Sequence, residues 1–280
     1  METFKTALEM QAWSFAKRKT GKTIAFVPTM GALHEGHLSL LREGKHRADI
    51  LVCSVFVNPA QFGPGEDLSR YPRDIENDLK KIKELKADAV FLPDDDVIYP
   101  KGYQTYVTLD EVTRHLCGLS RPGHFRGVAT IVLKLFNIVT PNVAIFGEKD
   151  FQQLVVIKRM VKDLDLPIEI VGMPIVRERD GLAMSSRNRY LSAEERNAAL
   201  SLSQSLTKAE LLIQKGERDP KKIIKTVRDA LYAAKIVHID YVELCDPETL
   251  EGMKTFRPPA LLAIAAAVGP TRLIDNRILK

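Results

Sequence analysis

The pattern of apolar and polar positions predicts a chain in which short apolar strands alternate with helices. Short apolar runs, typical of strands buried on both faces, lie at 24–27, 50–57, 89–92, 143–146 and 168–171. Apolar residues at helical spacing predict helices over 3–18, 38–47, 74–86 and 128–139, and another beginning near residue 150. This alternation is typical of an α/β fold with right-handed crossovers. We therefore predict a doubly wound, Rossmann-like parallel sheet over residues 1–175.

The predicted helices have definite buried faces. Phe4, Leu8 and Phe15 are expected on one side of the first helix, and a second such face belongs to the helix over 74–86. That face consists of Ile75, Leu79, Ile82 and Leu85. The segment 93–126 shows no regular pattern, and structureless stretches of this length in a domain are usually functional.

Residues 176–280 follow a different pattern. A polar connection over 174–183 precedes Ser192-Ala193-Glu194-Glu195, a capping-box sequence that predicts the start of a long helix. A second helix is predicted over about 219–235, and strands near 237–245, 260–268 and 271–278. We therefore predict a smaller α+β C-terminal domain over 176–280.

The composition is that of an ordinary soluble globular protein, with 280 residues, 45% hydrophobic and 28% charged. The longest apolar run, 260–268, is far shorter than the ~20 residues that span a bilayer. The N-terminus lacks the apolar core of a signal peptide. The cysteines Cys53, Cys117 and Cys245 show no paired spacing, which favours a reducing compartment over a disulfide framework or zinc cluster. We expect a cytoplasmic protein with no membrane partner.

The net charge of +5 suits an anionic ligand such as a nucleotide. It also leaves open a non-enzymatic RNA-binding module. That alternative needs aromatic residues interleaved with basic ones, and the basic region over 215–228 contains none. A solvated helix face explains this region better, so we expect no nucleic-acid partner.

The most informative stretch joins the first predicted strand to the next helix. It is Pro28-Thr29-Met30-Gly31-Ala32-Leu33-His34-Glu35-Gly36-His37. Ligands of open α/β sheets bind at the carboxyl ends of strands, and a helix N-terminus attracts anions. Either histidine alone would more simply fill a gap in the core. Together, His34 and His37 can donate to phosphate oxygens and stabilise negative charge that develops in a transition state.

Three further clusters carry candidate chemistry. Gly147, Glu148, Lys149 and Asp150 follow another predicted strand, where Lys149 suits a phosphate and Asp150 a ribose hydroxyl. A second cluster offers two hydroxyls and a guanidinium to a polyphosphate, and its residues are Met184, Ser185, Ser186 and Arg187. The third pairs Gln61 with Gln153, whose neutral amides can hold a carboxylate without quenching its nucleophilicity. Each cluster alone also fits a surface ion pair, a helix-entry loop or solvated side chains.

Other chemistries lack their sequence patterns. The chain contains no Gly-x-x-x-x-Gly-Lys-Ser/Thr loop, no Gly-x-Ser-x-Gly elbow and no His-Glu-x-x-His helix. These absences disfavour P-loop phosphoryl transfer, hydrolase chemistry of the nucleophile-elbow kind and a zinc protease.

The motifs together resemble a known family. His34-x-Gly36-His37 with Met184-Ser185-Ser186-Arg187 is similar to the signature pair of the nucleotidylyl-transferase superfamily, which includes class I aminoacyl-tRNA synthetases. More specifically, the chain resembles the pantothenate synthetase (pantoate–β-alanine ligase) family, in six motifs that run in order. They begin at Pro28, Asn58, Tyr71, Arg121, Phe146 and Ser185. One departure from the superfamily pattern is that Ala183 precedes Met184 where a lysine is usual, which weakens the interpretation as a tRNA synthetase.

The resemblance implies a two-step reaction. Pantoate attacks the α-phosphorus of ATP, with Mg²⁺ on the phosphates, to give pantoyl adenylate and pyrophosphate. The amine of β-alanine then attacks the acyl carbon and releases AMP. The partners implied are small molecules and a second copy of the chain in a homodimer.

The resemblance also implies roles for individual residues. It makes His37 the candidate proton donor with His34 beside it, and makes Gln61 and Gln153 the pantoate residues. ATP would be bound by Met30, Gly31, Ala32, Leu33, His34, Glu35, Gly36, His37, Gly147, Glu148, Lys149, Asp150, Val176, Met184, Ser185, Ser186 and Arg187. Metal ligands stay open, with Asp78 one candidate. An adenylyltransferase acting on a phosphorylated cofactor precursor stays open as an alternative function.

Overall fold

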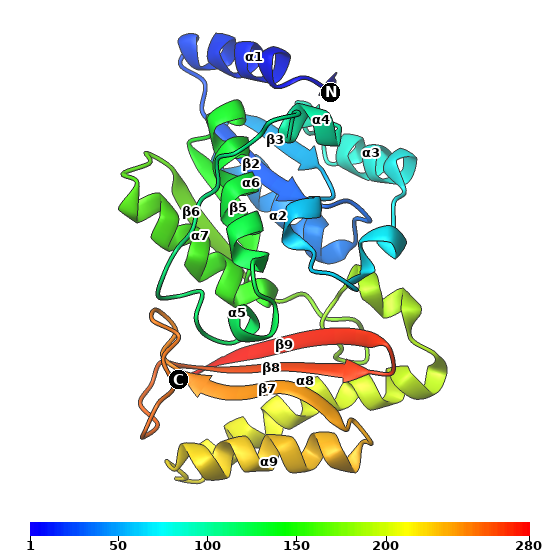
Figure 1. The fold of residues 1–280 in the computed structure, drawn as a ribbon, viewed down its shortest axis with the longest axis vertical. Coiled ribbons are helices and arrows are strands. Elements are labelled where there is room, and N and C mark those ends of the chain that lie inside the picture. Colours follow the sequence, from blue (N-terminus) through cyan, green and yellow to red (C-terminus); the bar gives the residue numbers. More distant parts are fainter. The chain divides into compact units, whose positions relative to one another are not determined.

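Six parallel strands form one sheet in the first of two units into which the chain divides (Figure 1). The computed structural model describes residues 1–280. Unit 1 comprises Met1–Asp110, Arg121–Glu148 and Val156–Pro174, and unit 2 comprises Glu111–Ser120, Lys149–Val155 and Ile175–Lys280. The domain boundary predicted near residue 175 stays a prediction.

The sheet of unit 1 has the order β1-β4-β3-β2-β5-β6. Its strands are β1 (Glu2–Phe4), β2 (Ile24–Thr29), β3 (Ile50–Val55), β4 (Ala89–Phe91), β5 (Val143–Gly147) and β6 (Glu169–Met173). All five pairings are parallel. The α/β prediction and its five strands are confirmed, and β2 and β5 are neighbours in the sheet.

Helices cover both faces of this sheet. Leu41 of α2 (Glu35–Arg47) and Ile82 of α3 (Ile75–Glu84) belong to the buried cluster that contains Ala25 and Val27 of β2. Phe26 points to the opposite face, where its ring lies 6.5 Å from Phe136 of α6 (His124–Val139). Successive residues of β2 therefore pack against different layers, as a doubly wound sheet requires.

Two other helices belong wholly or partly to unit 1. α1 (Ala7–Lys19) packs against α6, and α7 (Phe151–Asp163) connects β5 to β6. Within the irregular segment expected over 93–126 the structure has two single-turn helices, α4 (Asp95–Ile98) and α5 (Cys117–Ser120).

The first predicted helix is wrong at its beginning and on its buried face. Residues 2–4 form β1, because pairing with β4 satisfies their backbone groups at the sheet edge. The helix begins only after the N-cap Thr6. Leu8 and Phe15 are 76% and 47% exposed, whereas Met10 and Ser14 are buried. In α3, Ile75 is likewise 52% exposed, because it occupies the first position after the N-cap.

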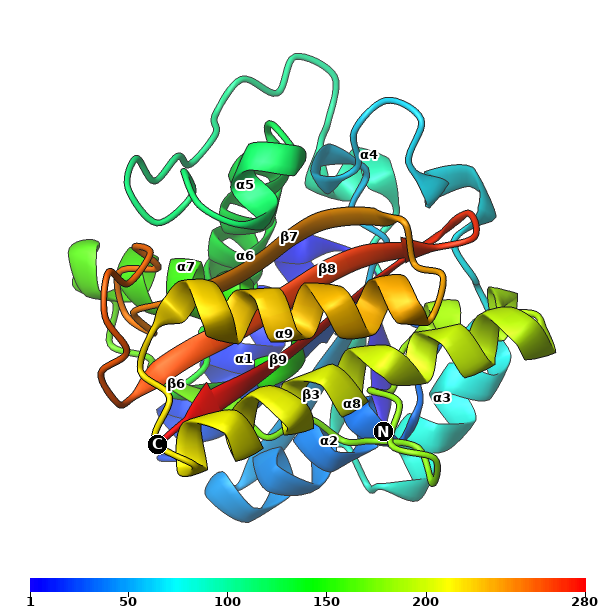
Figure 2. The same ribbon diagram turned by 90° about the horizontal axis from the view of Figure 1, so that it is seen from below.

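Unit 2 contains an antiparallel sheet in the order β7-β8-β9. The strands are β7 (His238–Cys245), β8 (Ala260–Val268) and β9 (Thr271–Leu279). Both long helices, α8 (Ala193–Gln214) and α9 (Pro220–Ala233), lie along one face of it (Figure 2). Ser192 caps α8 in the predicted capping box with Glu195. The α+β prediction for this part of the chain is confirmed.

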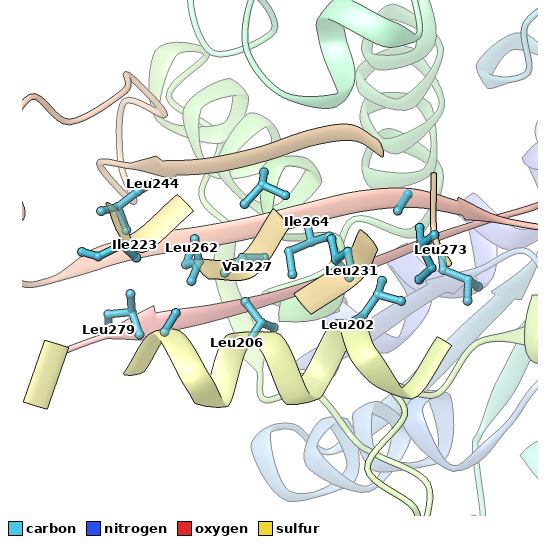
Figure 3. Close-up of a cluster of buried hydrophobic side chains, with 14 of the residues drawn as sticks. Leu202, Leu206, Ile223, Val227, Leu231, Leu244, Leu262, Ile264, Leu273 and Leu279 are labelled. Atoms are coloured by element: carbon cyan, nitrogen blue, oxygen red, sulfur yellow. The ribbon is translucent and has the colours of Figure 1, made fainter. Parts of the chain in front are cut away.

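The core of unit 2 is aliphatic (Figure 3). Leu202 and Leu206 of α8 and Val227 of α9 point at Leu262 and Ile264 of β8. Burial of one such side chain stabilises a fold by roughly 1.5–3 kcal/mol relative to exposure. Alternate residues of β8 belong to this core, and Leu261, Ala263 and Ala265 on its other face are buried as well, so the apolar run of β8 is continuous although the strand is antiparallel.

Two further observations concern the predicted setting of the protein. None of its helices combines the length and the apolar character that crossing a membrane requires. All three cysteines are buried and free.

Candidate active site

Two neighbouring strands of unit 1, β2 and β5, carry predicted ligand-binding segments at their carboxyl ends. β2 and β5 are neighbours, and the strand order changes direction between them. Ligands of open α/β sheets bind outside the carboxyl ends of strands at such a switch point. Met30–His37 follow β2 directly, and Gly147 and Glu148 stand at the end of β5.

Side chains of α3 make hydrogen bonds to the backbone of the loop after β2. The buried carboxylate of Asp78 accepts hydrogen bonds from the backbone N–H groups of Ala32 and Leu33, both at 2.7 Å. One turn later, the ammonium of Lys81 donates to the carbonyl of Leu33 at 2.6 Å. Gly31 has a φ of +80°, and a Cβ there would lie 2.9 Å from Asp78 Oδ2. The loop conformation therefore depends on glycine and on Asp78 together.

His34 and His37 lie at the start of α2, which begins earlier than predicted. His34 is the N-cap residue, and its backbone N–H donates to Nδ1 of His37 at 3.3 Å. The ring centroids are 4.2 Å apart. Because Nδ1 of His37 accepts a hydrogen bond, the proton of its neutral ring belongs on Nε2. In the same turn, Glu35 pairs with Arg42, whose hydrogen bond lowers the pKa of that carboxyl.

Gln61 lies in a single 3₁₀ turn, η1 (Pro59–Gln61), after β3. Its amide Nε2 lies 3.1 Å from the sulfur of Met30, which joins two predicted site segments. α6 approaches this turn closely, since a Cβ on Gly127 would lie only 2.2 Å from the carbonyl oxygen of Ala60. Gly127 is therefore required for the position of η1.

The backbone carbonyl of Gln61 is held from the start of α6. Nδ1 of His124 lies 2.8 Å from this oxygen, and the guanidinium of Arg121 donates to it at 3.3 Å. Arg121 also pairs with Glu66 at 2.6 Å. Burial opposes ionisation of Glu66, but the hydrogen bonds and charge of Arg121 outweigh it and lower the pKa of the carboxyl. These contacts fix both ends of the loop after β3.

Lys149, Asp150 and Gln153 belong to unit 2, in η3 (Glu148–Asp150) and the first turn of α7. The carbonyl of Lys149 accepts a hydrogen bond from Nδ2 of Asn276 in β9 at 2.9 Å. The neighbouring Gln152 is buried, and its amide bonds to backbone groups of 112, 115 and 117. Packing within unit 2 therefore fixes the backbone that carries Lys149 and Gln153.

A short hairpin carries the remaining predicted residues of unit 2. Arg177 and Ala183 form a bridge, and Met184 donates its N–H to the carbonyl of Val176 at 3.0 Å. Arg177 makes a bidentate pair with the buried Asp275 of β9, at 2.7 and 2.9 Å. Charged pairs of this geometry are strong and directional. Val176 and Met184 are thereby anchored to the same strand as Lys149.

The hairpin leads into η4 (Ser186–Tyr190), for which Ser185 is the N-cap residue. The hydroxyl of Ser185 accepts the N–H of Arg187 at 3.2 Å. The buried Asn188 donates to Glu178 at 2.6 Å and to the carbonyl of Ala183 at 3.0 Å. The loop that carries Ser185, Ser186 and Arg187 thus has a defined conformation in this structure.

Comparison with known proteins agrees with this architecture. The family model of pantoate-beta-alanine ligase matches residues 2–278. A pantothenate synthetase from Desulfatibacillum aliphaticivorans is 55% identical over the full length of both chains. The chain belongs to the pantoate-beta-alanine ligase family. The family resemblance and the enzyme class predicted from the motifs are therefore confirmed.

Solved structures of the pantoate-beta-alanine ligase family have the same fold. A crystal structure of pantothenate synthetase from Thermus thermophilus is 42% identical, covers 99% of each chain and gives a TM-score of 0.94. A pantoate-beta-alanine ligase from Francisella tularensis, complexed with beta-gamma ATP and β-alanine, is 30% identical and gives a TM-score of 0.81. The latter covers 99% of this chain and 97% of its own.

Several residues of the site have contacts that the sequence did not predict. Asp78, considered as a metal ligand, uses both oxygens on the loop after β2. Asn58 and Gly127 stood inside the motifs without a role, although a polar residue and a glycine inside matched motifs were the available signal. Asp275 and Asn276 gave no signal, because contacts between distant segments leave no local pattern. The individual site residues otherwise stay predictions.

Proposed function

We propose that this enzyme joins pantoate to β-alanine through a pantoyl-adenylate intermediate, with ATP consumed and AMP and pyrophosphate released. Family membership supports pantothenate formation. The complex of the Francisella tularensis relative supports ATP and β-alanine as ligands. The single observation that carries the proposal is the pair His34 and His37 at the start of α2, beside the switch point of the sheet.

In the first step, a pantoate carboxylate oxygen attacks the α-phosphorus of ATP. The new P–O bond forms as the bond to the pyrophosphate oxygen breaks, and the electron pair leaves with pyrophosphate. Nε2 of His37 is the proposed donor to the phosphate oxygens, since its Nδ1 accepts the N–H of His34. The positive end of α2 adds to this stabilisation. In-line displacement at phosphorus depends mainly on such positioning and charge stabilisation.

In the second step, the amine of β-alanine attacks the acyl carbon of pantoyl adenylate. The C–N bond forms, the bond to AMP breaks, and the amine loses a proton to solvent. Gln61 is the proposed contact to pantoate and to the border of the β-alanine site, with Gln153 the second pantoate residue. Both amides are neutral, so they hold a carboxylate without reducing its nucleophilicity.

We propose that unit 2 supplies the remaining ATP contacts. Lys149 is assigned to phosphate, Asp150 to ribose and Val176 to adenine. The residues proposed to close on the polyphosphate of ATP are Met184, Ser185, Ser186 and Arg187. The support is that Asp275 and Asn276, adjacent in β9, anchor the Val176 hairpin and the Lys149 backbone.

Replacing Asn276 tests this arrangement. Asn276→Ala removes the donor to the Lys149 carbonyl, and we expect KM for ATP to rise about three- to tenfold, the usual range for one hydrogen bond. KM for pantoate should change by less than twofold. Arg277→Ala is a matched control, because this neighbouring β9 residue pairs with Glu210 instead. An unchanged KM for ATP in Asn276→Ala would contradict the assignment of Lys149.

Mg²⁺ is proposed as the companion of the ATP phosphates. No group of three or more His, Cys, Asp or Glu side chains in residues 1–280 is placed to hold a metal ion. Mg²⁺ commonly keeps several waters and binds through substrate phosphates, so the proposal requires no protein cage. When bound, it neutralises charge on the leaving pyrophosphate.

Pyrophosphate exchange tests the proposed intermediate. Purified enzyme with Mg²⁺, ATP and labelled pyrophosphate, without β-alanine, should incorporate label into ATP only when pantoate is present. Labelled ATP in the absence of pantoate would contradict a pantoate adenylate. No exchange despite ATP binding would instead favour a concerted route, or the adenylyltransferase that acts on a phosphorylated precursor. The homodimer and the cytoplasmic location stay predictions.

A further inference from the structure

Two side-chain hydrogen bonds link Tyr99, in the irregular segment after β4, through the amide of Asn58 to the amide of Gln61. Asn58, 1% exposed, donates from Nδ2 to Oε1 of Gln61 at 3.0 Å and to the carbonyl of Gly127 at 3.2 Å. Its Oδ1 accepts the phenol O–H of Tyr99 at 2.7 Å and the backbone N–H of Ala60 at 3.3 Å. Tyr99 stands at the end of α4, 41 residues from Asn58 in the sequence.

These contacts determine which way each amide faces. The carbonyl of Gly127 can only accept and the N–H of Ala60 can only donate, so Asn58 can satisfy both in one orientation alone. In that orientation its Nδ2 faces Gln61, and only Oε1 of Gln61 can accept from it. Nε2 of Gln61 must then point away from Asn58, toward the sulfur of Met30 in the loop after β2. Gln61 is thus fixed as a hydrogen-bond donor on the side of that loop.

We propose that Tyr99 is a positioning residue that acts through Asn58 to keep the N–H₂ group of Gln61 facing the carboxylate of the substrate. This inference rests on the proposed function, in which Gln61 binds pantoate. A flipped Gln61 would present its carbonyl oxygen to a carboxylate, and two acceptors repel each other. This relay of hydrogen bonds, from Tyr99 through Asn58 to Gln61, therefore favours a substrate that offers a negatively charged or neutral hydrogen-bond acceptor at this position.

Tyr99 reinforces the orientation that the backbone groups of Gly127 and Ala60 give to Asn58. Its bond to Asn58 is the shortest of the four that this amide makes. Burial, followed by the neighbouring phenols of Tyr103 and Tyr106 and the carboxylate of Asp95, raises the pKa of Tyr99 well above its usual value. The phenol therefore keeps its proton at neutral pH and remains a donor to Oδ1 of Asn58.

The substitution Tyr99→Phe tests the relay. Loss of one neutral hydrogen bond is expected to raise KM for pantoate about five- to tenfold. KM for ATP should stay within the error of the wild type, and the midpoint of thermal unfolding should fall by only about 2–4 °C, the shift expected for one hydrogen bond. Tyr103→Phe is the matched control, since this residue keeps its ring contact with Tyr99 and its cation–π contact with Lys134. Equal changes in both KM values, or none in either, would overturn the proposal.

A double substitution separates the relay from a merely structural role. If Tyr99 acts through Gln61, Tyr99→Phe should have no further effect on KM for pantoate in a Gln61→Ala background. A full five- to tenfold effect in that background would overturn the proposal. Failure of the proposed function has a different signature, because the wild-type enzyme would then show no pantoate-dependent exchange.

A measurement on the resting enzyme does not depend on activity. The side-chain amide resonance of Gln61, identified by its loss in Gln61→Ala, should shift or broaden in Tyr99→Phe and stay in place in Tyr103→Phe. An unmoved resonance in Tyr99→Phe would contradict the relay even if turnover had changed.

Discussion

His37→Ala should lower the turnover of adenylate formation by about 10²–10³-fold, the loss typical of removing one donor that stabilises developing charge. The dissociation constant of ATP should change by less than tenfold. The reason is that Nε2–H of His37 is proposed to bind the phosphate oxygens more strongly as charge develops on them. Contacts that strengthen only in the transition state affect kcat and leave ground-state binding almost intact.

The measurement is single-turnover formation of AMP or adenylate beside equilibrium binding of ATP. His46→Ala is the control, because His46 is an exposed histidine in the last turn of the same helix. Equal losses of turnover and of ATP affinity in His37→Ala would contradict the proposed role of His37 in stabilising the transition state. Full activity would remove His37 from the mechanism.

Asp78→Asn should destabilise the protein by about 2–4 kcal/mol and reduce activity severely. The buried carboxylate accepts two backbone N–H groups, from Ala32 and Leu33. The amide replaces one acceptor oxygen with a donor, and a buried donor without an acceptor costs about 1–3 kcal/mol. The loop that leads to His34 would lose its fixed conformation, so turnover should fall together with stability.

Glu76→Gln is the matched control for this substitution, because it removes an exposed carboxylate from the same turn of α3. Urea unfolding and steady-state rates of the two variants should separate clearly. A variant Asp78→Asn that is as stable as the wild type, but needs more Mg²⁺ for full activity, would instead make Asp78 a metal ligand.

The sequence predicted the sheet well because its strands are buried on both faces. The runs at 24–27 and 143–146 are apolar throughout, the run at 50–57 is interrupted only by Ser54, and strands of this kind are hard to mistake. The edge strand β1 was not predicted, because three residues are too few to show the alternation of apolar and polar side chains that distinguishes a strand from a helix. The exposed Leu8 and Phe15 were assigned to the core because periodicity does not show which side of a helix meets a partner.

In the candidate site, too, some features could be predicted from the sequence and others could not. Motifs at strand ends located His34, His37, Gln61 and Lys149, since the rule for ligand binding depends only on strand order. The contacts that hold them were not predictable. Asp78 lies more than forty residues from the amides it binds, and Asn276 more than one hundred residues from Lys149. Such pairings are decided by tertiary packing, which leaves no short-range pattern.

The three-part composition of unit 2 has a consequence for synthesis of the chain. Its two short stretches, 111–120 and 149–155, leave the ribosome long before the strand that anchors them. Arg272, which donates to Cys117, follows its partner by 155 residues, and Asn276, which donates to Lys149, follows its partner by 127 residues. A nascent chain can therefore complete the sheet of unit 1 while Lys149 still lacks its anchor. The proposed ATP contacts of unit 2 would therefore be assembled only after the sheet of unit 1 has been synthesised.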